Sequence, residues 1–500
     1  MESKLEQLRT ILAEISDLSA AAALLGWDQQ TYMPSGSAEG RGYQLGTVET
    51  LAHLKFTAPE VGELLEQLQP YAAQLDPDSN EARLIKVTRR IYDKRTKVPA
   101  ELVTETAQVT AVAHQVWAEA RAENNFAKFQ PYLEKVVDLR CRYAELFAPY
   151  DHIYDPLLDD FEPGLKTADV KSIFEKLRPQ QVALVHAIAG KPQVKADFLY
   201  QTFDEQKQWD FGVQVISNFG YDWKHGRQDR SAHPFTQSIG SQDVRITTRF
   251  NSGFLNTGLF GTMHEAGHAL YEQGVDPALS RSPLESGASL AVHESQSRMW
   301  ENLVGRSLPF WEHFYPQLQR VFPSQLGDVP LDQFYKGINR VQPSFIRVEA
   351  DEATYNLHIM LRLEIEIALI EKSLQVKDLP EAWNSRMKEY LGITPENDSQ
   401  GVLQDVHWSG GMIGYFSTYA LGNLVSAQLW ERINSDLPDL PDHLRRGEFS
   451  ELLGWLREKI HRHGSKFEPQ ELIQRVTGSK IDPAAYLRYL NTKFSEIYKL

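Results

Sequence analysis

The spacing of apolar residues limits what this chain can fold into more than any other feature of its sequence. Near the N-terminus, apolar side chains recur three and four residues apart, which places them on one helix face: Leu5, Leu8, Ile11, Leu12, Ile15 and Leu18. Similar helical periods run through 80–148, 165–190, 205–220, 259–273, 290–304, 350–372 and 412–435. We therefore predict a mainly α-helical fold.

Strand signals are few. The segment 244–250 is rich in β-branched residues and ends at Asn251-Ser252-Gly253, which indicates a strand. A second alternating stretch, 361–367, also fits a helical period, and its Leu, Glu and Arg content favours the helix. We expect a small antiparallel β-sheet next to the helix of 259–273.

The composition is that of an ordinary globular protein and excludes several function classes. The chain has 52 Lys and Arg against 67 Asp and Glu, a net charge of −15, and no basic patch, so it should not bind nucleic acid. The single cysteine, Cys141, excludes an internal disulfide framework. No apolar run reaches the roughly 18 residues that span a membrane, and the opening MESKLEQLRT lacks the hydrophobic core of a signal peptide. We expect a cytoplasmic protein with no membrane partner.

The segment His264-Glu265-Ala266-Gly267-His268 carries the clearest chemical signal. Residues four apart on a helix lie about 5–6 Å apart on one face, so both imidazoles can bind one ion. Glu265 points about 100° away and can hold a zinc-bound water without being a ligand. Zinc lowers the pKa of such a water to about 7, and the carboxylate can take its proton as it attacks a carbonyl group. The pattern predicts a zinc hydrolase; the alternative is an amphipathic helix with two surface histidines.

A catalytic zinc needs a third protein ligand and one open position. Glu272 lies eight residues past His264, roughly 12 Å along the helix axis, and is too distant to join the cluster. The ligand should therefore come from the next helix, which carries His293-Glu294-Ser295-Gln296. We favour Glu294. His293 is the alternative, and a solvated charged helix face remains a further interpretation.

These motifs belong to a longer ordered series. It comprises Leu25-Gly26-Trp27-Asp28-Gln29-Gln30-Thr31-Tyr32-Met33-Pro34, His233-Pro234-Phe235, Asp243-Val244-Arg245-Ile246-Thr247, the His264–His268 and His293–Gln296 motifs, Ile346-Arg347-Val348-Glu349-Ala350-Asp351, and Gly401-Val402-Leu403-Gln404-Asp405-Val406-His407-Trp408. In this order, from about 20 to 425, the series resembles the Taq-type (thermostable carboxypeptidase) family of zinc metallocarboxypeptidases, which belongs to the gluzincin group.

The resemblance implies a fold, an activity and partners. The fold would be a helical, saddle-like metallopeptidase with a deep groove, forming one catalytic domain over 1–500, with an N-terminal helical cap over about 1–90 and a zinc-site core over about 230–425. The enzyme would be a homodimer that removes single residues from peptides with a free C-terminus, using zinc or in some members cobalt. By position, Glu294 becomes the third zinc ligand and Glu265 the general base.

An enzyme that acts only at chain ends must recognise the terminal carboxylate, and a guanidinium suits this best. Arg347 is the candidate, because it lies in the Ile346–Asp351 motif. A helix-surface ion pair with Asp351, four residues on, is its alternative role, and Asp351 could also orient it. Arg245 is the rival candidate, although its strand-like segment alone would suggest a structural ion pair.

The remaining candidates follow from the resemblance. Tyr415, in Ile413-Gly414-Tyr415-Phe416, looks like the tyrosine that stabilises the oxyanion in the converting-enzyme relatives, with Tyr419 as second choice. His407 and His233 resemble histidines that hydrogen-bond the substrate or the intermediate. Gln404 and Asp405 are expected to support these groups or to cap helices.

We thus predict a metallocarboxypeptidase in which Glu265 activates a zinc-bound water. Two alternatives remain open from the sequence. One is a zinc oligoendopeptidase, which would have no carboxylate clamp. The other is a catalytically inactive helical peptide-binding protein.

Overall fold

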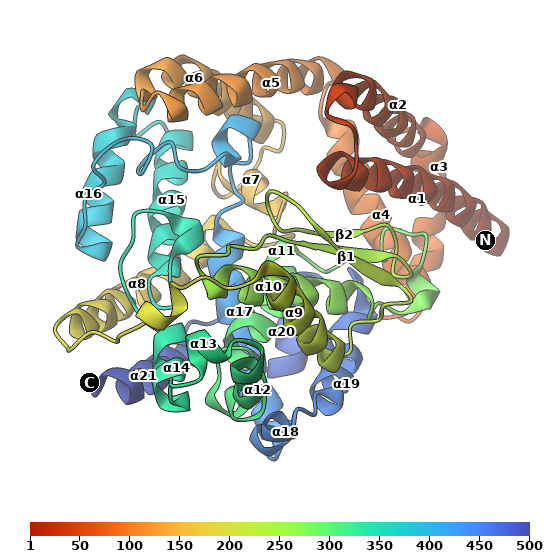
Figure 1. Ribbon diagram of the computed structural model, residues 1–500. Helices are drawn as coiled ribbons and strands as arrows, with labels where there is room; N and C mark the ends of the chain where they lie inside the picture. The colour runs from red at the N-terminus through yellow and green to blue at the C-terminus, as the bar shows by residue number, and fades with distance from the viewer.

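The computed structural model describes residues 1–500 and is built almost entirely of helices (Figure 1). The predicted fold class is therefore confirmed. In chain order the α-helices are α1 (Glu2–Thr31), α2 (Ala38–Phe56), α3 (Pro59–Ala72), α4 (Asn80–Lys97), α5 (Ala100–Ala122), α6 (Phe126–Glu145), α7 (Asp155–Asp159), α8 (Thr167–Ala189), α9 (Glu205–Phe219), α10 (Leu255–Glu272), α11 (Leu290–Arg298), α12 (Leu308–Val321), α13 (Pro323–Leu326), α14 (Leu331–Ile338), α15 (Tyr355–Ile370), α16 (Leu379–Leu391), α17 (Ser417–Asp436), α18 (Leu440–Arg446), α19 (Ser450–Lys459), α20 (Pro469–Thr477) and α21 (Ala484–Tyr498). A π-helical turn, Met299–Val304, continues α11.

Local sequence explains where the predicted helical runs break. The run 80–148 forms three helices, α4, α5 and α6, because Pro99 precedes the first residue of α5 and the side chain of Asn125 caps α6 by accepting from Lys128 N. The ambiguous stretch 361–367 lies within α15, so the helical interpretation was correct. All but two residues of α15 are buried. A helix that is buried on every side carries apolar residues all round, so its sequence can alternate as a strand does.

The sheet contains three short strands in the order β1-β3-β2: β1 (Gly226–Arg230), β2 (Thr236–Ser238) and β3 (Val244–Thr248). The prediction of a purely antiparallel sheet was wrong in this respect, because β3 pairs antiparallel with β2 but parallel with β1. Each strand reverses the direction of the one before it, and β3 lies between the other two. A turn at Gly240, whose φ is +143°, makes the last reversal.

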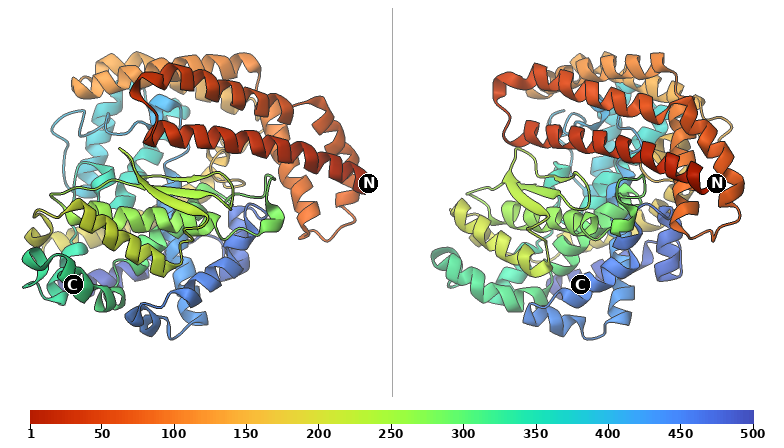
Figure 2. Two further views of the ribbon diagram at one scale, coloured as in Figure 1. Left: turned by 45° about the vertical axis from the view of Figure 1, so that its right-hand side comes forward. Right: turned by 90° about the vertical axis from the view of Figure 1, so that its right-hand side faces the viewer.

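The N-terminal helices have their own apolar core. A cluster of 16 buried residues lies mainly on α1–α4 and includes Val275, Leu279 and Leu284, whereas a cluster of 106 residues unites the chain from Ala113 to Tyr498. Figure 2 shows α1 and α2 lying across the sheet, with α10 on the sheet's other side. The division into a cap of 1–90 and a core of 230–425 stays a prediction.

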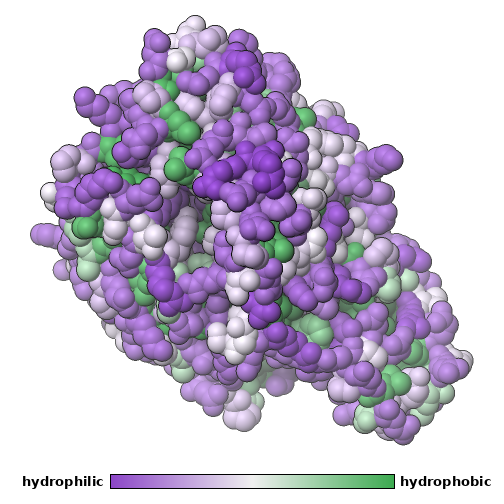
Figure 3. All heavy atoms as spheres, turned by 90° about the horizontal axis from the view of Figure 1, so that it is seen from below, coloured by the Kyte–Doolittle hydropathy of each residue, from purple (hydrophilic) through white to green (hydrophobic).

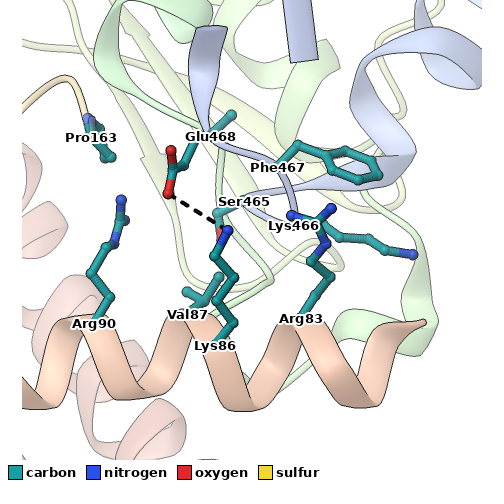
Figure 4. Close-up of a pocket in the computed structure, with 10 residues that line it drawn as sticks. Arg83, Lys86, Val87, Arg90, Pro163, Ser465, Lys466, Phe467 and Glu468 are labelled. Carbon is teal, nitrogen blue, oxygen red and sulfur yellow. Dashed lines mark ion pairs between the residues drawn. The ribbon is translucent and has the colours of Figure 1, made fainter. Parts of the chain in front are cut away.

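Charged contacts hold this N-terminal layer to the rest of the chain. At the end of α1, Trp27 lies against two guanidinium groups, those of Arg227 at 5.0 Å and Arg245 at 4.5 Å from its ring centroid. At the other end of the layer, Arg83 of α4 donates to both carboxylate oxygens of Glu471 at 3.0 and 2.8 Å. Figure 4 shows the small cavity at this junction. There Arg83 lies beside the ion pair that Lys86 of α4 forms with Glu468, the residue before α20.

The outer surface gives no sign of a membrane-spanning segment. The face drawn in Figure 3 is mainly hydrophilic, with apolar residues scattered over it. None of the helices combines the length and the apolar character that crossing a bilayer would need.

Candidate active site

Three predicted ligands converge on one point. His264 and His268 lie one turn apart on α10, with ring centroids 4.9 Å apart. Their Nε2 atoms lie 3.8 and 3.6 Å from Oε2 of Glu294 on α11. One ligand atom from each residue can be chosen so that all lie within 4.8 Å of one another. We call these three residues the metal triad.

Two glycines allow α11 to pack closely against α10 and α17. A β-carbon on Gly267 of α10 would lie only 2.6 Å from the Cα of Ser297 on α11. A β-carbon on Gly422 of α17 would lie 2.6 Å from Cβ and Cγ of Glu294. Helix α11 is thus held between α10 and α17 at a distance that no larger residue permits. Gly267 is one of the two unspecified positions of the His264–His268 motif.

Neighbouring charges orient two members of the metal triad. Nδ1 of His264 lies 2.8 Å from Oε2 of Glu301, so its Nε2 is left free to face Glu294. The Nε of Arg298 donates to Oε1 of Glu294 at 2.7 Å, which leaves Oε2 facing the histidines. Two imidazole nitrogens and one carboxylate oxygen, with no fourth protein ligand, are the donor set of a catalytic divalent metal site. The residues present therefore fit such an ion.

His293, the alternative ligand, lies outside this cluster. Its Nδ1 lies 2.8 Å from Nδ1 of His268, on the side of that ring away from Glu294. Its Nε2 lies 2.6 Å from Oε1 of Glu272. Both residues therefore stand behind His268.

Glu265 is held by the neighbouring strand. The hydroxyl of Thr236 on β2 lies 2.8 Å from Oε2 of Glu265 and 2.9 Å from its carbonyl oxygen. A hydroxyl has one proton, so it can donate to either oxygen in turn. Burial raises the pKa of the Glu265 carboxyl, and the Thr236 hydroxyl opposes this by stabilising the charged form.

Arg347 is buried in a 3₁₀ turn, Arg347–Glu349, and not in a helix. Its Nε and one terminal nitrogen donate to Oδ1 of Asp405 at 3.1 and 2.8 Å, and its other terminal nitrogen donates to the hydroxyl of Tyr355 at 2.9 Å. A guanidinium has five N–H groups. One N–H on each terminal nitrogen is thus left without a protein acceptor.

The alternative role of Arg347, an ion pair with Asp351, is not found in the structure. The segment does not continue as a helix, so the two residues are not on one face. The carboxylate of Asp351 instead accepts from the backbone nitrogens of Gln342, Ala353 and Thr354 at 2.9–3.1 Å and stabilises the turn before α15.

Asp405 joins two buried arginines. Its Oδ2 lies 2.6 Å from a terminal nitrogen of Arg362, whose side chain is 0% exposed, while its Oδ1 pairs with Arg347. The backbone nitrogen of Arg347 also donates to Oε1 of Gln404 at 2.9 Å. Gln404 and Asp405 therefore hold Arg347 in place. We call Arg347, Arg362 and Asp405 the arginine cluster.

The segment after Asp405 folds around a buried carboxylate. Glu366 of α15 accepts from Nε1 of Trp408 at 2.7 Å, from the backbone nitrogen of Gly414 at 2.9 Å and from the hydroxyl of Tyr154 at 2.5 Å. Burial raises its pKa to about 7, against the effect of these three donors. Sequence reasoning gave Glu366 no role.

Tyr415, Tyr419 and His407 form an aromatic group beside the arginine cluster, where the guanidinium of Arg347 lies 4.9 Å from the ring centroid of Tyr419. The ring centroid of Tyr415 lies 5.2 Å from that of His407 and 5.3 Å from that of Tyr419, and the hydroxyl of Tyr419 lies 3.3 Å from Nε2 of His407. Burial raises the pKa of Tyr415. Burial lowers the pKa of His407 to about 4, so its imidazole is neutral at pH 7.

The structure does not bring Arg245 and His233 into contact with these groups. Arg245 pairs with both carboxylate oxygens of Asp243 at 2.8 and 2.7 Å and lies against Trp27, as a structural residue would. His233 is exposed and its ring makes no hydrogen bond, although Thr236, three residues on, contacts Glu265. Substrate contacts by either residue stay predictions.

Sequence reasoning missed several residues that orient the candidate ligands. Arg298 and Glu301 follow Glu294 by four and seven residues, which is helical spacing, and so could have been found. Thr236 and Arg362 had no such signal, because each meets its partner across a tertiary contact.

Two residues, Arg298, which donates to Glu294, and Tyr355, link the metal triad to the arginine cluster. The guanidinium of Arg298 lies 4.4 Å from the ring centroid of Tyr355, whose hydroxyl accepts from Arg347. A metal-binding site with a neighbouring carboxylate base, inside a mainly helical fold and next to a buried arginine, defines a metal-dependent peptidase.

Comparisons with known proteins agree with this class. The family described as Carboxypeptidase Taq (M32) metallopeptidase matches residues 7–494, and the chain belongs to this family. Thermostable carboxypeptidase 1 of Thermus thermophilus is 42% identical over 507 residues, covering 99% of each chain, and carboxypeptidase 1 of Bacillus subtilis is 38% identical over 98% of each. The crystal structure of the M32 carboxypeptidase from Deinococcus radiodurans superposes with a TM-score of 0.96 at 40% identity and covers both chains completely. The protein is therefore a metallocarboxypeptidase.

Proposed function

We propose that this enzyme uses zinc to remove single amino acids from the C-termini of peptides, with Glu265 as its general base. The observation that carries the proposal is that Arg298 and Tyr355 connect the metal triad to Arg347, an arginine with two unused N–H groups. One cluster suits hydrolysis of a peptide bond, and the other suits recognition of the chain end. Zinc fits the donor set best, and cobalt is the alternative ion.

The bound ion would supply Lewis-acid polarisation of the scissile carbonyl and activation of water. Glu265 accepts the proton of the attacking water and then delivers it to the nitrogen of the leaving amino acid. Thr236 keeps the carboxylate in the orientation that both transfers require.

Arg347 is proposed to bind the C-terminal carboxylate of the substrate. Its two free N–H groups lie on different terminal nitrogens, which is the arrangement that a carboxylate accepts from in a bidentate pair. Asp405 holds the opposite edge of the guanidinium, so the free edge has a fixed direction. An amidated peptide has no terminal carboxylate and cannot form this bidentate pair, so the free N–H groups of Arg347 would lack their acceptor.

The tyrosines are proposed to act on the other side of the scissile bond. Tyr415 donates its hydroxyl to the oxyanion, since its pKa stays above neutrality and its proton is available. Tyr419 and neutral His407 orient this hydroxyl and contact the substrate backbone. His233 and Arg245 remain candidates for substrate contacts farther from the cleaved bond.

The test compares a decapeptide with its C-terminally amidated twin, each incubated with zinc-loaded protein and with a chelated control, and read by mass spectrometry. We expect stepwise loss of residues from the free C-terminus, weak cleavage of the amide and none with chelator. Internal cuts in both peptides would identify an endopeptidase instead.

The same assay tests the general base. Glu265→Gln should keep the metal, measured by elemental analysis, but lose about 10³-fold in kcat, because the amide cannot take a proton. His264→Ala should lose both metal and activity. Near-native turnover by Glu265→Gln would contradict the mechanism.

We further propose that the enzyme is a cytoplasmic homodimer. The dimer rests on the family resemblance, and the location is supported by the lone buried cysteine, Cys141, which forms no disulfide. Sedimentation equilibrium of the purified chain tests the dimer. A single species at the monomer mass of 57.0 kDa would contradict it.

A further inference from the structure

A line of three hydrogen-bonding side chains extends from the metal triad into the protein. His268 of α10 faces Glu294 with its Nε2 and faces His293 of α11 with its Nδ1 at 2.8 Å. His293 in turn faces Glu272, the last residue of α10, through its Nε2 at 2.6 Å. His268 and His293 are about one-fifth exposed, and Glu272 is buried. The line of side chains thus runs from α10 to one residue of α11 and back to α10.

The chemistry of the imidazole fixes the proton positions along this line. A histidine that offers Nε2 to a metal ion must keep its proton on Nδ1. Nδ1–H of His268 therefore donates, and Nδ1 of His293 must accept. An imidazole that accepts at Nδ1 carries its proton on Nε2, and this N–H can donate to the carboxylate of Glu272. One arrangement satisfies all three residues.

The neighbours of His293 hold its ring in this orientation. Its ring centroid lies 5.0 Å from that of Tyr271, and a β-carbon on Gly287 would lie 2.7 Å from its Cδ2. The ring therefore has little freedom to turn. His264 differs, because a carboxylate, Glu301, contacts its Nδ1 directly.

We propose that His293 and Glu272 are positioning residues that hold His268 in the tautomer and ring orientation needed to bind the ion through Nε2. The inference rests on the proposed metal site and assigns a task to two residues that do not touch the ion themselves. Without the acceptor on the His293 ring, Nδ1–H of His268 would lose its side-chain partner, and the other tautomer would compete.

The experiment measures the zinc dissociation constant of the apoprotein by competition with a chromophoric chelator. His293→Phe keeps a planar ring but removes the acceptor, and should weaken zinc binding 10- to 100-fold. His293→Asn places an amide oxygen near the position of Nδ1 and should stay within about threefold of the wild type. At saturating zinc, KM should be unchanged in both variants.

His461 provides a matched control. It too packs on Tyr271, at 5.1 Å between ring centroids, but it is fully buried and its Nε2 contacts Gln296 and not a ligand. His461→Phe should therefore leave zinc affinity unchanged. An equal loss in His461→Phe, or no loss in His293→Phe, would overturn the proposal.

A second pair of variants asks the same question at the other end of the line and serves if His293→Phe does not fold. Glu272→Gln retains an oxygen that accepts from Nε2–H of His293 and should bind zinc nearly as well as the wild type. Glu272→Leu retains none and should weaken binding. Equal affinities for the two would exclude Glu272. Failure of the wild-type chain to bind zinc would instead reject the proposed metal site, so the two failures are distinguishable.

Discussion

The metal triad and the arginine cluster use buried charge in opposite ways. The ligands of the metal triad project from α10 and α11, which are regular helices held by their own backbone hydrogen bonds. In the arginine cluster, Arg347 and Asp405 come from irregular segments 58 residues apart, and their ion pair joins those segments. In one cluster the fold orients the charges. In the other the charges maintain the fold. Substitutions should therefore separate activity from stability differently in the two clusters.

The largest effect on stability is expected at Asp405. Asp405→Ala leaves Arg362, which is 0% exposed, and Arg347 without their anionic partner. We expect the free energy of unfolding to fall by about 4 kcal/mol, measured by urea titration. Asp243→Ala is the control, because it removes the partner of Arg245 but is itself 39% exposed, and should cost less than about 1 kcal/mol. Similar losses of unfolding free energy in both variants would show that the arginine cluster does not maintain the fold more than an exposed ion pair does.

A pH-dependent effect is expected at Glu366, which holds the segment that follows Asp405. The folded-state pKa of about 7 exceeds the ordinary value of 4.5, so the folded chain binds this proton more tightly than the unfolded chain. The resulting stability is fully present below pH 4.5 and is lost as the pH rises through 7, by about 3 kcal/mol in total.

Glu366→Gln cannot titrate, so the difference in stability between it and the wild type should shrink by that amount as the pH rises from 4.5 to 8. At acidic pH the variant should be the less stable of the two proteins, because the amide nitrogen cannot accept from Trp408 or Gly414. Urea titrations of both proteins across this range test the prediction. Parallel pH curves would contradict it.

Arg347 should affect substrate choice more than stability, since Asp405 keeps Arg362 as a partner. Arg347→Ala should lower kcat/KM for free-carboxylate peptides about 100-fold, the value of a lost charged bidentate pair. On amidated peptides the change should be small. Equal losses on both substrates would remove Arg347 from carboxylate binding and would make it a purely structural member of its cluster.

The smallest predicted effect concerns Thr236, which orients Glu265 from outside α10. Thr236→Val should lower kcat about tenfold and leave KM and metal content unchanged, because only the position of the base is relaxed. Thr236→Ser keeps the hydroxyl and should restore kcat. Ser238→Ala, two residues along β2, is the control and should resemble the wild type. A loss of bound metal in Thr236→Val would show that the strand supports the metal triad as well.

The same contrast explains how much the sequence could predict. Helical periodicity and the spacing of His264 and His268 predict both the helix and the shared face, because both properties are local. Glu294 could be proposed from the next helix, but its approach depends on Gly267 and Gly422, whose role is visible only in the packed helices. The pairing of Arg347 with Asp405 had no local signal. Helical spacing suggested Asp351 instead, and this failed because the segment turns after Arg347.

The direction of β1 shows a similar limit. The strand composition of 244–250 predicted β3, but β1 has no apolar side chain and β2 has only three residues, so neither produces an alternating pattern. Tertiary packing on α10 decides that β3 is the central strand. Because β3 pairs with both other strands, and runs parallel to β1, the sheet is mixed.

The close approach at Gly267 and Gly422 also bears on ion size. At Gly267 main chain meets main chain, and at Gly422 main chain meets Cβ and Cγ of Glu294, so α11 is held close to both neighbouring helices. We expect this packing to limit how far the three ligand atoms can move apart. The two ions proposed above, zinc and cobalt, would need no such movement. Calcium, with oxygen ligands at about 2.3–2.6 Å and six to eight of them, would require α10 and α11 to separate. The two glycines should therefore contribute to selectivity against large ions, although neither carries a side chain.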